Sequence, residues 1–134
     1  MAQTGEPVVA LEVVTERAQW DQFLALPHRL YADDPAWIAP LDFEQRQRFS
    51  PANHFFDHAR WRAWLAVRAG VAVGRITAQI DAMHLRQHAD GVGYFGMLEC
   101  EDDPAIFAAL LGAAADWLRS EGMQRLRGPL NLHI

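Results

Sequence analysis

The sequence contains no lysine, and twelve arginines carry all of its positive charge against 17 acidic residues. The resulting net charge of −5 argues against nucleic-acid binding, because neutralising a phosphate backbone requires a basic surface. Cys100 is the only cysteine, which excludes an intrachain disulfide and a cysteine-based metal site. No stretch approaches about 18 consecutive apolar residues, and the N-terminus lacks a basic start. We therefore expect a cytoplasmic protein without a signal peptide, membrane partner or nucleic-acid partner.

The stretch Tyr94 to Gly122 combines a predicted strand, an acidic turn and the clearest helix in the chain. Tyr94 to Cys100 is rich in aromatic and aliphatic residues, which favours a buried strand. Asp103 is typical of a helix N-cap, Pro104 suits the first helical position, and Gly122 suits a left-handed stop. One apolar face is predicted for the helix, formed by Ile106, Leu110, Ala114, Trp117 and Leu118, with Phe107 and Leu111 widening it.

The N-terminal third predicts a strand followed by a helix. Pro7 to Thr15 is β-branched and apolar, and Thr15 is expected to cap a helix that starts at Glu16. Pro27 is expected to bend or split this helix, and Asp33-Asp34-Pro35 is expected to end it. The side chains of Trp20, Phe23 and Leu24 should face inward.

The remaining chain predicts an antiparallel hairpin and a last strand. Trp61 to Arg68 and Val73 to Asp81 alternate in polarity on either side of a turn at Gly70, and Arg125 to Ile134 is predicted as a fifth strand. The aromatic segment Ala36 to Asp57 should wrap over the sheet. The order β, α, β, β, β, α, β indicates an α+β or mixed α/β fold in a single domain, residues 1–134. Because the sequence stops on an apolar strand, we expect a domain cut mid-fold that self-associates through this edge.

Four stretches resemble the GNAT (GCN5-related N-acetyltransferase) family, and in particular its large bacterial GNAT-like proteins. They are LPHRLYADDPAWIAPL, NHFFDHARWRAWLAVRAG, VGRITAQID and RGPLNLHI. The resemblance runs from about Leu11 to the last residue and implies a GNAT-like fold, truncated after its fifth strand. It also implies that this chain is the N-terminal part of a longer protein.

The resemblance further implies transfer of an acyl group from acetyl-CoA or another acyl-CoA to a small-molecule amine. In that fold the acyl-CoA lies against the fourth strand, which here offers Met97, Leu98 and Cys100 as cofactor-binding residues. Glu99 lies where several GNAT enzymes place the general base. Strict alternation puts it on the same face as Phe95 and Met97, whose apolar side chains should raise its pKa. The alternative for Glu99 is a strand-end carboxylate that is solvated or paired with an arginine.

The turn after this strand departs from the family pattern. GNAT enzymes usually hold the CoA diphosphate on an Arg/Gln-x-x-Gly-x-Gly/Ala turn at a helix N-terminus. Here the turn is Glu101-Asp102-Asp103-Pro104, with three carboxylates and no glycine. Because carboxylates repel a phosphate, a second hypothesis is a degenerate GNAT-like module that serves as a scaffold or interface.

Three other patterns are weaker candidates for a functional site. Cys100 as a nucleophile lacks a nearby base in any motif, so a small buried residue is the better interpretation. His54 with His58, and His84 with His88, have the i, i+4 spacing of metal ligands, but they lie in loop-like segments and are expected to be solvated without a metal. Gly91-Val92-Gly93 precedes a strand rather than a helix and is expected to form a turn.

Overall fold

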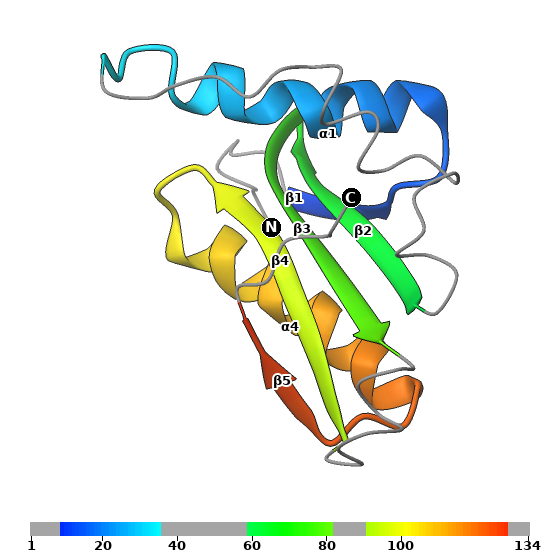
Figure 1. The fold of residues 1–134 in the computed structure, drawn as a ribbon. Helices are drawn as coiled ribbons and strands as arrows, with labels where there is room; N and C mark the ends of the chain where they lie inside the picture. Colours follow the sequence, from blue (N-terminus) through cyan, green and yellow to red (C-terminus); the bar gives the residue numbers. More distant parts are fainter. Residues whose placement is uncertain (1–8, 36–58, 82–90, 129–134) are drawn as a thin grey trace, which may run out of the picture.

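Five strands form one sheet whose spatial order, β1-β2-β3-β4-β5, follows the chain. The computed structural model describes residues 9–35, 59–81 and 91–128. Strands β1 to β4 pair antiparallel, whereas β5 runs parallel to the start of β4. This arrangement confirms the expected mixed α/β fold (Figure 1). The elements are β1 (Val9–Val13), α1 (Arg17–Leu30), β2 (Ala59–Arg68), β3 (Val71–Asp81), β4 (Val92–Cys100), α4 (Pro104–Ser120) and β5 (Arg125–Arg127).

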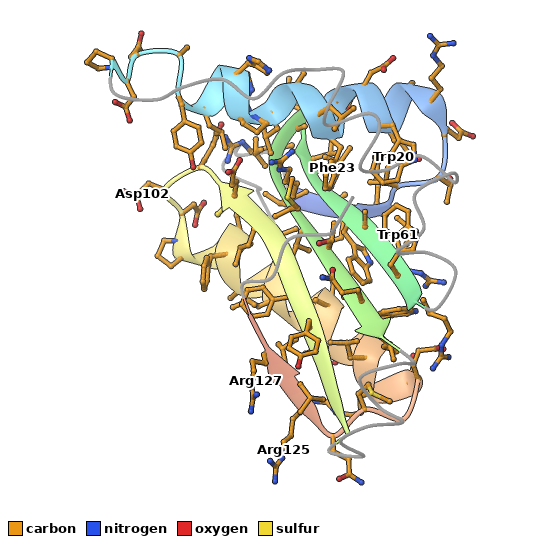
Figure 2. All side chains as sticks on the ribbon, viewed as in Figure 1. Trp20, Phe23, Trp61, Asp102, Arg125 and Arg127 are labelled. Carbon is orange, nitrogen blue, oxygen red and sulfur yellow. The ribbon has the colours of Figure 1, made fainter. Side chains whose placement is uncertain are left out.

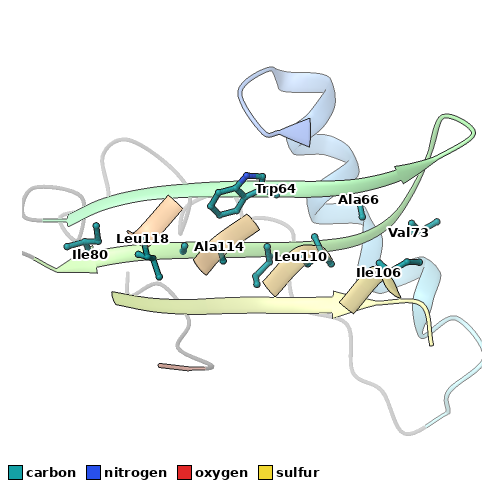
Figure 3. Packing of buried hydrophobic residues seen from close by; sticks show 10 residues of the cluster. Trp64, Ala66, Val73, Ile80, Ile106, Leu110, Ala114 and Leu118 are labelled. Carbon is teal, nitrogen blue, oxygen red and sulfur yellow. The ribbon is translucent and has the colours of Figure 1, made fainter. Parts of the chain in front are cut away.

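The two helices cover opposite faces of the sheet. Alternation along β2 sends Trp64 and Ala66 into the cluster beneath α4, and Ala63 and Leu65 into the cluster beneath α1. Figure 3 shows the first cluster, in which side chains of α4 fill the space over the strands. The central strand β3 is covered on both sides as a result, and every residue from 72 to 80 is buried.

Helix α4 begins and ends where the sequence predicts. The Asp103 side chain accepts a hydrogen bond from the Ala105 N–H at 2.9 Å, and Pro104 is the first helical residue. Gly122 takes the left-handed φ of 89° just after the helix. The prediction that Phe107 widens the apolar face is wrong, because this residue is 46% exposed. The fully buried positions are Ile106, Leu110, Ala114 and Leu118.

Helix α1 differs from expectation at both ends. Its N-cap is Glu16 rather than Thr15, and the Gln19 side-chain oxygen accepts from the N–H groups of both residues, at 2.8 Å from Thr15 and 3.0 Å from Glu16. The helix runs through Pro27 without a break and ends at Leu30, before the Asp33-Asp34-Pro35 stop. Phe23 and Leu24 are buried as predicted, and Trp20 packs against the same cluster (Figure 2).

The predicted hairpin is confirmed in β2 and β3, whose ends pair at Arg68 and Val71. Ala69 and Gly70 both have positive φ, of 52° and 78°, which is the two-residue turn that matches strand twist. The predicted wrapping of Ala36 to Asp57 falls outside the described residues. So does most of the expected fifth strand, because β5 spans Arg125–Arg127 and the described residues end at Gly128.

Candidate active site

A cleft of about 520 Å³ opens where β4 ends and α4 begins. The last residues of β4 supply one wall, and the acidic turn before α4 supplies the rim. Figure 2 shows Asp102 at the outer edge of this turn, pointing away from the sheet. The cleft is lined by Tyr31, Leu98, Glu99, Cys100, Glu101, Asp102, Asp103, Pro104 and Phe107.

Strand β4 carries one extra residue next to this cleft. Its pairing with β3 steps from Thr77 opposite Gly96 to Arg75 opposite Glu99, so two residues of β4 face one residue of β3. Met97 takes a left-handed φ of 53° at this point. The arrangement is a β-bulge, a feature that bends a strand and redirects the side chains after it.

The bulge changes which side chains share a face. Phe95 packs with the cluster beneath α4, whereas Met97 belongs to the cluster beneath α1. The expectation that Glu99 shares a face with both of them is therefore wrong for Phe95, because strict alternation assumes no extra residue. Glu99 lies on the α1 side, where its carboxylate meets Arg75.

The environment of Glu99 combines burial with one buried cation. Burial raises the pKa of the Glu99 carboxyl above its ordinary value, and the Arg75 guanidinium opposes this rise. Arg75 Nη2 lies 3.3 Å from Glu99 Oε2, and the two side chains are 4% and 27% exposed. The carboxylate is thus both paired with an arginine and open to the cleft. Sequence reasoning had not singled out Arg75, whose pairing depends on the shifted register.

The residues expected to contact acyl-CoA lie on two different faces. Leu98 and Cys100 line the cleft and pack towards the α4 cluster. Met97 is 8% exposed and packs in the α1 cluster. Tyr31, which follows α1, also lines the cleft, and burial followed by the charge of Glu99 raises the pKa of its phenol.

Several N–H groups around the start of α4 already have acceptors within the chain. The N–H groups of Ile106 and Phe107 both donate to the Asp103 carbonyl, at 3.1 and 3.2 Å, and that of Ala105 donates to the Asp103 side chain. The Glu101 N–H donates to the Val73 carbonyl at 2.9 Å. Pro104 has no N–H to offer. A diphosphate at this turn would therefore meet carboxylates, and N–H groups that already donate elsewhere.

Glu101 differs from its neighbours because two arginines hold it. Its carboxylate lies 2.6 Å from Arg68 Nη2 and 3.3 Å from Arg29 Nη1. These hydrogen bonds, with that from Arg68 the stronger, lower the pKa of the Glu101 carboxyl. The charge of Glu101 is therefore balanced locally, whereas the exposed Asp102 adds its negative charge to the rim.

The thiol of Cys100 is a poor nucleophile in this setting. Burial, followed by the charges of Asp103, Asp102 and Glu101, raises the pKa of the Cys100 thiol, which suppresses the thiolate. Among the described residues no group of three or more His, Cys, Asp or Glu side chains is placed to hold a metal. The pairs His54/His58 and His84/His88 lie outside those residues.

Solved structures with the same fold are acetyltransferases. The aminoglycoside N-acetyltransferase AAC(6')-Iy in complex with CoA matches 98% of this chain and 82% of its own, with a TM-score of 0.64 at 14% identity. A tandem GNAT protein from the clavulanic acid biosynthesis pathway matches 85% of this chain and 34% of its own, with a TM-score of 0.61 at 17% identity. At such identities the likeness establishes the fold alone. The chain has the fold of the GNAT acetyltransferases.

Two curated bacterial proteins are much closer in sequence. Protein YghO of Escherichia coli K12 is 49% identical over 112 residues, which cover 84% of this chain and 29% of that protein. The bacterial ceramide synthase of Caulobacter vibrioides is 49% identical over 120 residues, covering 87% of this chain and 31% of that protein. The chain thus spans less than a third of the length of these relatives.

No model of a known protein family matches the chain. Within the part that the structure describes, neither helix is long and apolar enough to cross a membrane.

Proposed function

We propose that this chain belongs to an N-acyltransferase that moves an acyl group from an acyl-CoA to an amine, with Glu99 as the general base. The observation that carries the proposal is the placement of Glu99, a half-buried carboxylate that lines the cleft directly after the β4 bulge. The GNAT fold, shared with a structure that holds CoA, supports acyl-CoA as the co-substrate. Fold alone does not fix function, so the carboxylate is the stronger argument.

The proposed reaction requires a proton acceptor at this position. An amine that enters as an ammonium ion must lose a proton before its nitrogen can attack the thioester carbonyl. Glu99 takes this proton, and the C–N bond forms. The nitrogen then loses its second proton as the C–S bond breaks, and that proton passes to the departing CoA thiolate. The raised pKa of Glu99 strengthens it as a base, while the Arg75 guanidinium favours the ionised form, which is the form that accepts a proton.

The cleft suits a cationic head group attached to an apolar body. Glu99 and Asp102 present negative charge, which favours an ammonium ion over a phosphate. Leu98, Pro104 and Phe107 add apolar surface to the same cleft. A relative is named a ceramide synthase, and a ceramide is the amide of a long-chain amino alcohol. We therefore propose long-chain amino alcohols as the acceptor class.

The second candidate is a GNAT-like module that has lost CoA binding and acts as a scaffold or interface for the rest of the protein. It is favoured by the start of α4, where protein acceptors occupy the N–H groups and carboxylates surround the site. If the enzyme proposal holds, the diphosphate of the acyl-CoA must be held by other groups than this turn.

Calorimetry with acyl-CoAs and detection of the N-acyl product by mass spectrometry decide between the candidates. In the complete gene product we expect acyl-CoA binding and acylation of a long-chain amino alcohol. Glu99→Gln should lower kcat/KM by about 10²–10⁴-fold, the usual contribution of a general base. Asp116→Asn, at an exposed carboxylate on α4, is the matched control and should leave kcat/KM unchanged.

Two outcomes would contradict the enzyme proposal. The complete gene product could show no heat with any acyl-CoA, or Glu99→Gln could keep full activity. In the first case, replacing Glu101 to Pro104 with a glycine- and arginine-containing turn tests the scaffold candidate. A gain of CoA affinity in that variant would identify the acidic turn as the block to binding.

A further inference from the structure

Pro27 leaves one carbonyl of α1 without its helical partner. The helix is continuous from Arg17 to Leu30, so the carbonyl of Phe23 faces the nitrogen of Pro27, four residues later. That nitrogen carries no hydrogen. Phe23 has a fully buried side chain, which leaves its carbonyl little access to water. A buried carbonyl without a donor is costly, so another group must supply one.

Arg75 supplies this donor. Its Nη1 donates to the Phe23 carbonyl at 2.8 Å, and its guanidinium carbon lies 4.8 Å from the centre of the Phe23 ring. The same guanidinium presents Nη2 to Glu99 at 3.3 Å. Because the guanidinium is planar and rigid, a hydrogen bond at one nitrogen and the contact with the ring together restrict the direction of the other nitrogen.

The bulge in β4 brings Glu99 to this guanidinium. Arg75 and Glu99 are paired across β3 and β4 immediately after the extra residue. Without the extra residue, alternation from Phe95 would send Glu99 towards α4 and away from Arg75. Two local departures from regular structure, a proline inside a helix and a bulge inside a strand, thus meet at one ion pair.

Resting on the proposed function, we propose that Arg75 is the positioning residue that holds the Glu99 carboxylate at the cleft. Pro27 in turn positions the Arg75 guanidinium, because it offers no N–H to the Phe23 carbonyl, which accepts a hydrogen bond from Arg75 instead. The contact to Glu99 is an ion pair without hydrogen-bond alignment, since Glu99 Oε2 has no hydrogen-bond partner among the described residues. The carboxylate is therefore oriented without being locked, and it stays available to an acceptor in the cleft.

The charged and titratable groups that face Glu99 determine in which direction a change at Arg75 shifts the ionisation of Glu99. Arg75 from β3 is the cation beside it, Tyr31 approaches from the end of α1, and the turn before α4 adds Glu101, Asp102 and Asp103 to the same cleft. Of these groups, the guanidinium alone favours the ionised form of Glu99. Weakening the contact with the guanidinium makes ionisation of Glu99 less favourable. The acidic limb of the kcat/KM profile should therefore move to higher pH.

Pro27→Ala is the first test, because it returns an N–H to α1. The restored backbone N–H competes with Arg75 for the Phe23 carbonyl, while alanine is the better helix former. We expect an unchanged or higher melting temperature together with an upward shift of the Glu99 titration, followed by ¹³C NMR of labelled glutamate and assigned by its loss in Glu99→Gln. Gln22→Ala, on the exposed side of α1, is the control and should leave the titration in place.

Substitution of Arg75 itself is the second test. Arg75→Met removes the cation and should lower kcat/KM at the acidic end of the profile by roughly tenfold or more. Arg75→Lys keeps the charge but cannot present two fixed nitrogens, one to the carbonyl and one to the carboxylate, so an intermediate shift is expected. The Pro27→Ala and Arg75→Lys variants keep the test decisive if Arg75→Met does not fold.

The two readouts separate this inference from the proposed function. A Glu99 titration that stays unchanged in both Pro27→Ala and Arg75→Lys overturns the positioning role, whether or not the protein is a transferase. A titration that shifts while the kcat/KM profile does not would support the link from Arg75 to Glu99 and overturn Glu99 as the base. Parallel shifts of both support the whole inference.

Discussion

Glu99 and Glu101 are two residues apart at the end of β4, yet their carboxyl groups are shifted in opposite directions. Burial raises the pKa of Glu99, with Arg75 opposing, whereas hydrogen bonds from Arg68 and Arg29 lower the pKa of Glu101. The difference lies in what surrounds each carboxylate and not in the residue type. This separation leaves one carboxylate suited to proton transfer and the other suited to holding the turn in place.

The lowered pKa of Glu101 predicts a specific dependence of stability on pH. The folded state favours the ionised form, so the contribution is present above the unfolded glutamate pKa of about 4.3 and is lost as pH falls through the folded value. Because all three side chains are partly exposed, Glu101→Gln should cost less than about 1 kcal/mol at pH 7. Urea unfolding at pH 7 and below pH 4 should show the difference from the natural sequence shrinking in acid. Asp102→Asn is the control, and an equal cost at both pH values would contradict the ion-pair account.

The sequence predicts Glu99 as a candidate but not its partner. The resemblance points to the fourth strand, and pairing with an arginine was one of the alternatives. Which of the twelve arginines pairs with it depends on strand register, and the bulge at Met97 shifts that register by one residue. The proline in α1 was visible in the sequence, and the rule that it frees the carbonyl four residues earlier could have pointed to Phe23.

At the scale of elements, α4 sits close to the sheet because glycines lie beneath it. A Cβ atom at Gly74 would stand 2.8 Å from Leu110 Cδ1, 2.9 Å from Cys100 Cβ and 3.0 Å from Ile106 Cγ2. At Gly93 it would stand 2.5 Å from Leu118 Cδ2. These glycines therefore set the distance between the helix and strands β3 and β4.

This close approach predicts that Gly74→Ala is destabilising. The added methyl group must displace atoms from both α4 and β4, and overpacking of this kind costs about 1–3 kcal/mol. Gly112→Ala is the matched control on α4, since a Cβ there meets nothing within 4 Å and alanine favours the helix by about 0.5–1 kcal/mol. In chemical denaturation, the midpoint should therefore fall for Gly74→Ala and rise for Gly112→Ala. Equal stability of Gly74→Ala and the natural sequence would show that the helix can shift without cost.

The ends of α4, which depend only on neighbouring residues, are predicted correctly from the sequence. The cap at Asp103, the proline after it and the stop at Gly122 act within one helical turn, and all three are confirmed. The bulge at Met97 and the exposure of Phe107 depend on how distant elements pack, which a period-two or period-3.6 pattern does not contain. The N-cap of α1 fell one residue from its predicted place because Gln19 serves the N–H groups of both Thr15 and Glu16.

At the scale of the whole molecule, the negative charge is focused where the proposed substrates meet. The chain carries a net charge of −5, and four carboxylates line one cleft. Arginines pair with Glu99 and Glu101, so Asp102 and Asp103 give the cleft its negative sign. A cleft of one sign concentrates ligands of the opposite sign and repels those of the same sign. The two proposed substrates carry opposite charges, so the same field should attract the amine and oppose the acyl-CoA.

Salt should therefore change the two Michaelis constants in opposite directions. Raising ionic strength from about 0.01 to 0.15 M shortens the screening length from about 30 to 8 Å, which weakens the field over the cleft. We expect KM for the cationic acceptor to rise and KM for the acyl-CoA to fall, measured by steady-state kinetics on the complete gene product.

Asp102→Asn removes an exposed charge from the rim of the cleft, and it should reduce both salt effects. Asp116→Asn changes the net charge equally but lies on α4 outside the cleft lining, so it should leave both effects in place. A parallel change of the two constants with salt, or an equal response of the two variants, would show that net charge and not the cleft governs substrate approach.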